Sequence, residues 1–117
     1  MGAGERHDQR LFCYGTLRQE EVQRALFGRR LAGEPDLITG YRLGEVRIDD
    51  PDLIAQSGSA VHPILVATGD PADEVAGTVF RLDLAELAAA DDYEVAPYVR
   101  VAAPLRSGGT AWAYVKG

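Results

Sequence analysis

Short apolar runs, separated by turns rich in glycine, proline and aspartate, are the feature of this sequence that most constrains its fold. Strand-like runs occur at residues 11–14, 38–48, 60–67, 77–82, 98–105 and 110–115. Only two stretches, residues 20–27 and the segment after Asp83, have helical spacing of apolar residues. Strands and helices do not alternate regularly, which disfavours a doubly wound parallel sheet. The pattern predicts an α+β fold: a curved, mainly antiparallel sheet or small β-barrel flanked by two helices.

Glycine and proline mark where the predicted strands bend or end. Gly40 and Gly44 interrupt the run at residues 38–48 and indicate bends or bulges, as in a small barrel. Pro63 makes the run at residues 60–67 an edge strand or divides it into two pieces. Residues 49–52 and 69–73 are expected to be turns, and residues 106–109 a hairpin turn.

The two predicted helices have recognisable ends. Gly28 is placed to end the first helix, and residues 83–86 form an Asp-led variant of a capping box at the start of the second. One face of the second helix is expected to hold Leu84, Leu87 and Ala88.

Length and composition indicate one ordinary globular domain. The chain has 117 residues, which suffices for a single domain with one modest core, and residues 1–9 are expected to form a loose tail. The net charge of −6 argues against nucleic acid or an anionic membrane as a partner, because both require a basic surface. The single cysteine excludes an internal disulfide and fits a reducing cytoplasm. No signal peptide and no apolar run of membrane-spanning length is recognised.

The first candidate site is the segment Tyr14-Gly15-Thr16-Leu17, at the end of the first strand. Gly15 has no Cβ atom, so a ligand can approach the backbone closely. Successive free N–H groups at such a turn form an anion site. The alternative is an ordinary strand-to-loop turn with a packing tyrosine.

The second candidate site is residues 91–100, where three carboxylates, two tyrosines and an arginine follow the second helix. A carboxylate in a partly apolar environment has a raised pKa and can exchange protons near neutrality. The alternative is a solvated helix end. However, negative side chains at a helix C-terminus oppose the helix dipole, so this run of carboxylates is unusual.

Other polar residues are weaker candidates. Cys13 lies within a strand, where a small buried core residue is favoured over a nucleophile. His7 and His62 have no partners at metal-ligand spacing. We therefore expect neither a metal nor an organic cofactor.

Taken together, the two candidate sites resemble the motifs of the gamma-glutamylcyclotransferase-like superfamily. The chain has Tyr-Gly-Thr-Leu where the family has Y-G-[ST]-L, and Asp-Asp-Tyr-Glu where it has L-D-x-Y-E-G. Residues 40–43 and 77–80 are similar to the family's G-Y-x-L and G-x-V-[FY] strands. Each motif is short, and the ordered set, which spans residues 11–115, carries the resemblance.

The resemblance implies a small mixed, mainly antiparallel β-barrel flanked by two helices and the cleavage of a small-molecule gamma-glutamyl amide. It makes Glu94 the catalytic residue and the backbone of Tyr14, Gly15, Thr16 and Leu17 the substrate cradle. We add Tyr98 and Arg100 as substrate-binding candidates, because they follow Glu94 in the second candidate site. The sequence departs from the family at Val95, where many members have glycine, and at Ala90, where leucine is common.

The implied reaction is an intramolecular acyl transfer that gives 5-oxoproline and a free amine without a metal or cofactor. Two alternatives remain open: a non-catalytic module that binds a small ligand, and a hydrolase in which Glu94 activates water.

Overall fold

The computed structural model describes residues 8–47, 51–52, 55, 61–94 and 98–117. Its strands are β1 (Gln9–Cys13), β2 (Gly33–Thr39), β3 (Tyr41–Arg47), β4 (Val61–Ala67), β5 (Glu74–Leu82), β6 (Tyr98–Pro104) and β7 (Thr110–Lys116). Its helices are α1 (Glu20–Phe27) and α3 (Leu84–Tyr93), and a short 3-10 turn, η2 (Thr16–Arg18), follows β1. No helix in these ranges is long and apolar enough to cross a membrane.

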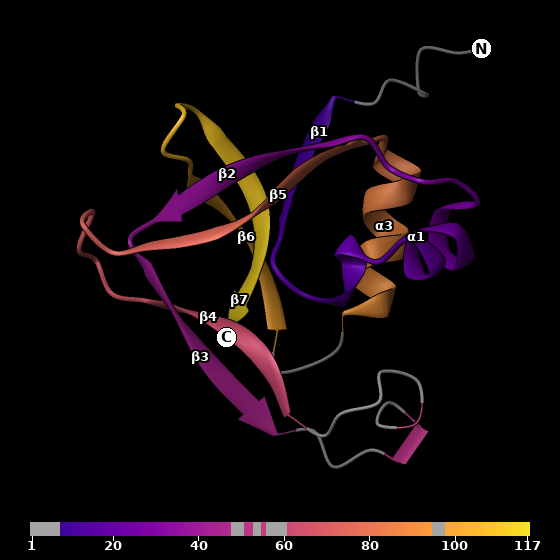
Figure 1. The fold of residues 1–117 in the computed structure, drawn as a ribbon, viewed down its shortest axis with the longest axis horizontal. Coiled ribbons are helices and arrows are strands. Elements are labelled where there is room, and N and C mark those ends of the chain that lie inside the picture. The colour runs from indigo at the N-terminus through magenta and orange to yellow at the C-terminus, as the bar shows by residue number, and fades with distance from the viewer. Residues whose placement is uncertain (1–7, 48–50, 53–54, 56–60, 95–97) are drawn as a thin grey trace.

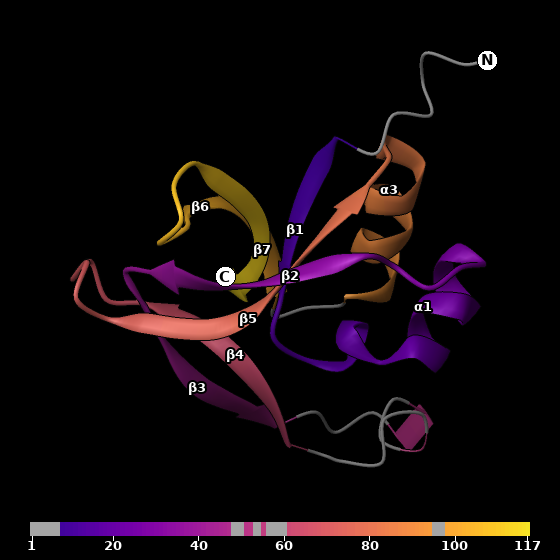
Figure 2. The ribbon, with the colours of Figure 1, turned by 45° about the horizontal axis from the view of Figure 1, so that its top comes forward.

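The strands form one strongly curled sheet. Their order is β2-β5-β1-β7-β4-β3, and β6 pairs with β7 outside this path. The β1–β7 and β4–β7 pairs are parallel, whereas the other pairs are antiparallel. The two ends of the path, β2 and β3, are joined through Gly40 alone, whose φ of 83° is accessible mainly to glycine. This corner curls the sheet into a half-barrel (Figure 2), which confirms the predicted mixed, mainly antiparallel α+β fold.

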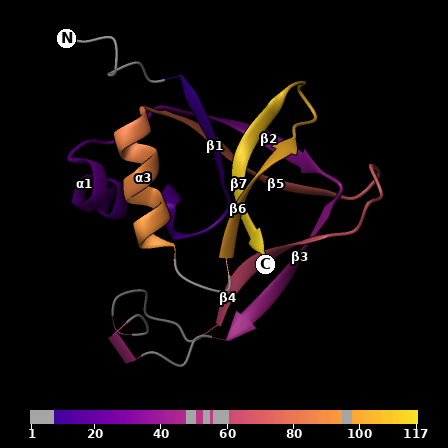
Figure 3. The same ribbon diagram turned by 180° about the vertical axis from the view of Figure 1, so that it is seen from behind.

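Both helices lie side by side on one side of the half-barrel (Figures 1 and 3). Arg29, just after α1, donates two hydrogen bonds to Glu86 of α3, at 2.8 and 2.9 Å. The predicted capping box is confirmed, since Asp83 accepts from the Glu86 N–H and Glu86 accepts from the Asp83 N–H. The predicted cap at Gly28 is also confirmed, and its φ is 71°.

The strand β1 separates two parts of the core because successive side chains of a strand point to opposite faces. Phe12 packs inside the half-barrel with Ile38 and Leu65. Leu11 and Cys13 pack on the other face, in the cluster that includes Leu87 and Ala90 of α3. Burial on both faces explains why β1 is continuously apolar. It also confirms that Cys13 is a core residue, with 4% of its surface exposed.

The predicted face of the second helix was wrong in part. Leu87 is buried as expected, but Leu84 is 63% exposed and Ala88 is also exposed. Ala90 is fully buried instead. Leu84 is the first residue of α3, and the buried face of this helix begins one turn later, at Leu87.

The predictions for Pro63 were also wrong, because β4 is continuous and is not an edge strand. The register of β4 with β7 contains a single pair, Leu65 with Val115, so the edge of β4 that faces β7 has no strand partner at Pro63. Proline is therefore tolerated inside this strand, because its missing N–H leaves no ladder hydrogen bond unmade.

Element boundaries differ from the predictions in several places. β1 begins at Gln9, inside the predicted tail, and β2 begins at Gly33, five residues before the predicted strand. The predicted turn at residues 49–52 is helical at Pro51 and Asp52. Residues 1–7, 48–50 and 95–97, which include His7, Asp49 and Val95, lie outside the described residues.

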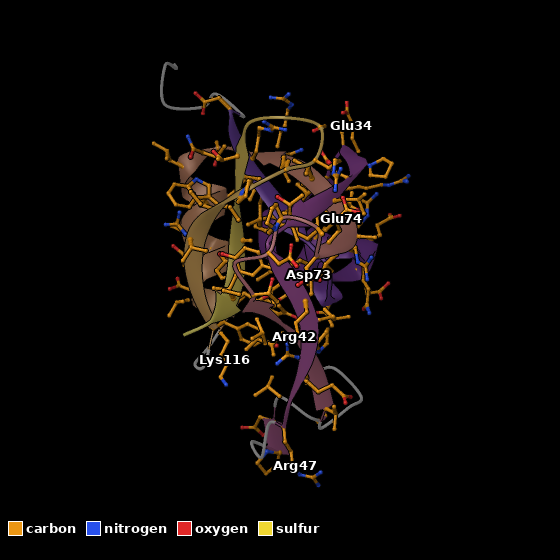
Figure 4. All side chains as sticks on the ribbon, turned by 90° about the vertical axis from the view of Figure 1, so that its left-hand side faces the viewer. Glu34, Arg42, Arg47, Asp73, Glu74 and Lys116 are labelled. Atoms are coloured by element: carbon orange, nitrogen blue, oxygen red, sulfur yellow. The ribbon has the colours of Figure 1, made fainter. Side chains whose placement is uncertain are left out.

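The side of the half-barrel away from the helices carries charged side chains of both signs. Figure 4 shows Glu34, Asp73 and Glu74 toward one end of this side, and Arg42, Arg47 and Lys116 toward the other. Glu74 forms an ion pair with Arg106. This side therefore combines acidic and basic groups, and the features that distinguish the candidate site lie elsewhere, between β1 and α3.

Candidate active site

Strands β1 and β4 pair with the same edge of β7, and the hydroxyl group of Tyr14 lies in the gap between them. β6 pairs along the whole of one edge, so β1 and β4 must both use the other, with Leu11 opposite Trp112 and Leu65 opposite Val115. Tyr14 follows the end of β1, donates a hydrogen bond to the carbonyl oxygen of Tyr114 at 2.6 Å, and accepts one from the N–H of Leu65 at 3.2 Å. This side chain replaces main-chain hydrogen bonds in the gap between β1 and β4.

The hydroxyl group of Tyr98 also bonds to the main chain of β4, next to the contact of Tyr14. Tyr98 begins β6 and donates a hydrogen bond to the carbonyl oxygen of Pro63 at 2.8 Å. Pro63 and Leu65 are two positions apart in β4, so their polar groups lie on the same edge of the strand. Burial, followed by the Glu94 carboxylate, raises the pKa of Tyr98 to about 12, so its hydroxyl group stays protonated and remains a donor.

The segment Tyr14–Leu17 turns away from β1 with all four of its carbonyl oxygens engaged. Two of the four oxygens accept a hydrogen bond from a side chain, that of exposed Arg18 or that of buried Gln23. The other two accept from backbone N–H groups of the same turn. The hydrogen bonds are Arg18 Nη2 to Tyr14 O at 2.8 Å, Arg18 N to Gly15 O at 3.2 Å, Gln19 N to Thr16 O at 2.9 Å, and Gln23 Nε2 to Leu17 O at 2.8 Å.

In contrast to the carbonyl oxygens, three N–H groups of this turn have no hydrogen-bond partner among the described residues. Those of Gly15, Thr16 and Leu17 donate no hydrogen bond to any acceptor within residues 8–47, 61–94 and 98–117. Gly15 has a φ of −128°, and the nearest atom to a Cβ added there is Pro63 Cγ at 3.9 Å. Neither the backbone conformation nor a close protein neighbour therefore requires a glycine at position 15. The space next to its backbone is open.

Glu94 lies directly after α3, and a hydrogen bond joins the residue before it to the turn. The hydroxyl groups of Tyr93 and Thr16 are 2.7 Å apart. The N–H of Glu94 donates to Ala90 O at 3.0 Å, which continues the helical pattern to Glu94 itself. These contacts place the predicted catalytic residue and the predicted cradle next to each other, although 77 positions separate the bonded pair in the sequence.

The carboxyl group of Glu94 is partly buried, and burial raises its pKa from the ordinary 4.5 to about 7. Burial is also the main reason why the pKa values of Cys13, Tyr14, Tyr98 and Tyr114 are raised, and the Glu94 carboxylate contributes to the rise in all four. The group therefore lies among one thiol and three phenols that are uncharged near neutral pH. A carboxyl group of this kind can both accept and donate a proton near pH 7.

Arg100, in β6, contacts the last turn of α3 through Asp91. Its guanidinium group donates two hydrogen bonds to Asp91, at 2.7 and 3.1 Å, and stacks on the ring of Trp112 at 4.4 Å. Tyr114 donates a further hydrogen bond to Asp91 at 2.8 Å. The contacts of Asp91 link the last turn of α3 to β6 and β7, and the ion pair offsets the unfavourable position of Asp91 at a helix C-terminus. Among the described residues, Arg100 makes no hydrogen bond or ion pair with the Tyr14–Leu17 segment.

Two other kinds of chemistry have no support in the described residues. Burial and the neighbouring Glu94 raise the pKa of Cys13 well above its ordinary range, although Arg18 opposes the shift, so a thiolate nucleophile is disfavoured. No group of three or more His, Cys, Asp or Glu side chains in the part of the chain that the structure describes is arranged to hold a metal ion.

The residues that support the site from outside its motifs were not predicted from the sequence. Arg18 and Gln23 hold carbonyl oxygens of the turn, but neither lies in a pattern that marks this contact. Gln23 is only 2% exposed, although it is a polar residue in a helix that was predicted from the spacing of its apolar residues. Tyr114 was part of an apolar strand pattern, and its hydroxyl contact with Asp91 depends on tertiary structure.

Comparisons with known proteins agree with this fold. The family profile described as "Gamma-glutamyl cyclotransferase, AIG2-like" matches residues 11–117. The chain belongs to this family. None of the curated proteins with which the sequence was compared matches it.

Three solved structures illustrate the similarity. A solution structure of a protein from Arabidopsis thaliana has a TM-score of 0.74 and 20% identity, covering 99% of this chain and 66% of that one. A crystal structure of an uncharacterized protein from Pyrococcus horikoshii has a TM-score of 0.61 and 22% identity, covering 94% of this chain and 79% of that one. A structure of a gamma-glutamyl cyclotransferase has a TM-score of 0.67 and 16% identity, covering 93% of this chain and 66% of that one. The chain thus spans just under two thirds of the first and third of these proteins, and at these identities the similarity concerns the fold.

Proposed function

We propose that this protein is an enzyme that cleaves a small gamma-glutamyl amide by intramolecular acyl transfer, giving 5-oxoproline and a free amine. The observation that carries the proposal is the placement of Glu94 beside the Tyr14–Leu17 turn, with Tyr93 bonded to Thr16 at 2.7 Å. A proton-exchanging carboxyl group and unbonded backbone N–H groups are the two components that this reaction requires from a protein. The family assignment supports the same proposal.

In the proposed reaction, the Glu94 carboxylate takes a proton from the α-amino group of the substrate. The amine nitrogen then attacks the δ-carbonyl carbon of the same glutamyl residue, forming a new C–N bond and a five-membered ring. The carbonyl oxygen becomes an oxyanion, and N–H groups of Gly15, Thr16 and Leu17 are the donors that we assign to it. As the ring carbonyl re-forms, the original amide C–N bond breaks and Glu94 returns the proton to the departing amine.

The reaction needs no nucleophile from the protein, because the substrate carries its own. Holding two reacting groups of one molecule in the correct orientation accounts for about 7–11 kcal/mol of the barrier in favourable cases. The tasks left to the protein are folding the substrate, moving one proton and stabilising one oxyanion. A site with a single catalytic carboxyl group is sufficient for them.

Tyr98 and Arg100 have different roles in this proposal. The hydroxyl group of Tyr98 borders the site through its hydrogen bond to Pro63, so we keep Tyr98 as a residue in contact with substrate. Arg100 is engaged by Asp91 and Trp112, so we assign it to holding the end of α3, and with it Glu94, in place.

The test is incubation of the protein with a panel of gamma-glutamyl amines, followed by mass spectrometry of the products. Formation of 5-oxoproline with one equivalent of free amine supports the proposal. Free glutamate in place of 5-oxoproline identifies a hydrolase, and an unchanged ligand that binds identifies a non-catalytic module. Either of these two results overturns the proposed reaction.

A further inference from the structure

We propose that Arg18 is a positioning residue that sets the direction of the backbone N–H groups in the Tyr14–Leu17 turn. This inference rests on the proposed function, because it assigns those N–H groups to the substrate. It concerns a side chain outside the Tyr-Gly-Thr-Leu motif that does not itself contact the reacting atoms.

The side chain of Arg18 folds back onto the turn. Its Nη2 donates to Tyr14 O at 2.8 Å, and its Nε approaches Gly15 O at 3.4 Å. The backbone N–H of Arg18 donates to the same Gly15 oxygen at 3.2 Å. One residue therefore holds two consecutive carbonyl groups on one side of the chain.

The geometry of the peptide group connects the direction of each carbonyl oxygen to the direction of the next N–H group. A trans peptide is planar, so its C=O and N–H bonds point in opposite directions. Tyr14 O shares its peptide plane with the N–H of Gly15, and Gly15 O shares its plane with the N–H of Thr16. When Arg18 holds both oxygens on its own side, both N–H groups are turned to the other side. Both are without an acceptor in the described part of the chain, and the adjoining residue Thr16 is bonded to Tyr93, next to Glu94.

The planar shape of the Arg18 guanidinium group distinguishes it from a lysine side chain. A guanidinium group is planar and presents several donors in fixed directions, whereas the ammonium group of lysine acts as a point charge. Lysine at position 18 would keep the charge and the backbone hydrogen bond to Gly15 O, but its side chain would not hold Tyr14 O and Gly15 O in a fixed relation. The Arg18 side chain is exposed, so its replacement disturbs no core packing. Positioning and charge can therefore be separated by comparing two substitutions.

The experiment compares Arg18→Lys and Arg18→Ala with the parent protein. Arg24→Ala serves as the matched control, since Arg24 is also exposed and its ion pair joins it to Glu20 within α1. We expect kcat/KM for a gamma-glutamyl amine to fall about tenfold in both Arg18 variants, with the melting temperature little changed, and to stay unchanged in the control. Full recovery of kcat/KM by Arg18→Lys overturns the inference, because it shows that charge alone is required.

A second measurement reports on the turn without activity. In nuclear magnetic resonance spectra of the ligand-free proteins, Arg18→Lys is expected to shift the amide signals of Gly15 and Thr16, whereas Arg24→Ala is not. Amide signals that stay in place overturn the inference even if the parent is an active enzyme. If the parent forms no 5-oxoproline, the proposed function fails, and the amide signals alone decide whether Arg18 sets the turn.

Discussion

The hydroxyl oxygen of Tyr14 lies 2.6 Å from the carbonyl oxygen of Tyr114, although the two residues are 100 positions apart in the sequence. The same hydroxyl group accepts a hydrogen bond from Leu65, so a single atom connects the residue that follows β1 to β4 and β7. The turn that carries the N–H groups of Gly15 and Thr16 starts from this junction. The position of the candidate site is thus set by the place where two strands meet the same edge of a third.

Removing this hydroxyl group tests its structural role. Tyr14→Phe leaves the N–H of Leu65 and the carbonyl of Tyr114 without their partner in a partly buried place. We expect the free energy of unfolding, measured by urea denaturation, to fall by about 1–3 kcal/mol. Tyr41→Phe is the control, because Tyr41 packs against the same core but its hydroxyl group makes no hydrogen bond within the described residues. Equal losses in the two variants would contradict the bridging role.

The ion pair between Asp91 and Arg100 leads to a second prediction. Asp91→Asn weakens the contacts to both Arg100 and Tyr114, whereas Asp92→Asn changes an exposed neighbouring carboxylate. Because the pair is only partly buried, with side chains 27% and 38% exposed, we expect a loss of no more than about 1 kcal/mol in stability. We expect kcat/KM to fall more than stability suggests, since the end of α3 positions Glu94. Variants with indistinguishable kinetics would show that this network has no part in the reaction.

The pH dependence of activity follows from the pKa of Glu94. The carboxylate form is required to accept the first proton, so kcat/KM should rise with pH and level off above an apparent pKa of about 7. The comparison enzyme is Tyr41→Phe, which removes a hydroxyl group without a hydrogen bond in the described residues, so its apparent pKa should equal that of the parent. A rising limb centred near the ordinary carboxyl value of 4.5 would contradict the assignment of Glu94 as the base.

The same group makes a separate prediction about stability. Its pKa is higher in the folded state than its ordinary 4.5, so between about 4.5 and 7 the folded protein binds a proton that the unfolded chain has lost. The contribution of protonated Glu94 is therefore fully present below pH 4.5 and is lost as pH rises to about 7. Glu94→Gln cannot ionise, so its stability relative to the parent should improve across this window by roughly 1–3 kcal/mol. Parallel stability–pH curves for the two proteins would contradict the burial of this carboxyl group.

Gly15 and Gly109 form a pair for testing the cradle. Gly15 has no left-handed backbone and no close protein neighbour, so Gly15→Ala should melt normally but bind 5-oxoproline more weakly, because the methyl group occupies space assigned to the ligand. Gly109 has a φ of 73°, so Gly109→Ala should lower stability by about 1–2 kcal/mol without weakening binding. Calorimetric titration together with thermal melting measures both properties. Undiminished binding by Gly15→Ala would make the turn a purely structural feature.

Short-range chemistry explains which elements were predictable from the sequence. The capping box at Asp83 and the end of α1 at Gly28 depend on contacts within a few residues, so their patterns are visible in the sequence. The hairpin between β6 and β7 is likewise marked by adjacent glycines, Gly108 and Gly109. The motifs also placed Glu94 and Gly15 in one site, although no local pattern shows that their segments meet.

What could not be predicted depends on partners that are distant in the sequence. The first half of β2 contains Pro35, which is acceptable there because β2 lies at the end of the sheet order and pairs with β5 on one edge. Pro63 is tolerated because β7 leaves that part of β4 unpaired. The contacts of Arg18 and Gln23 with the turn use ordinary polar residues, and only the folded chain shows which oxygen atoms they reach.

The most direct test of the central claim is the measurement of 5-oxoproline by mass spectrometry after incubation of gamma-glutamyl amines with the parent protein and with Glu94→Gln. Glutamine keeps the shape of the side chain but cannot carry the proton, so we expect the folded variant to form product at least about 10²- to 10⁴-fold more slowly while it still binds ligand. Product formation by the parent and its near-complete loss in Glu94→Gln is the predicted result. Near-normal product formation by a folded Glu94→Gln protein would contradict the account.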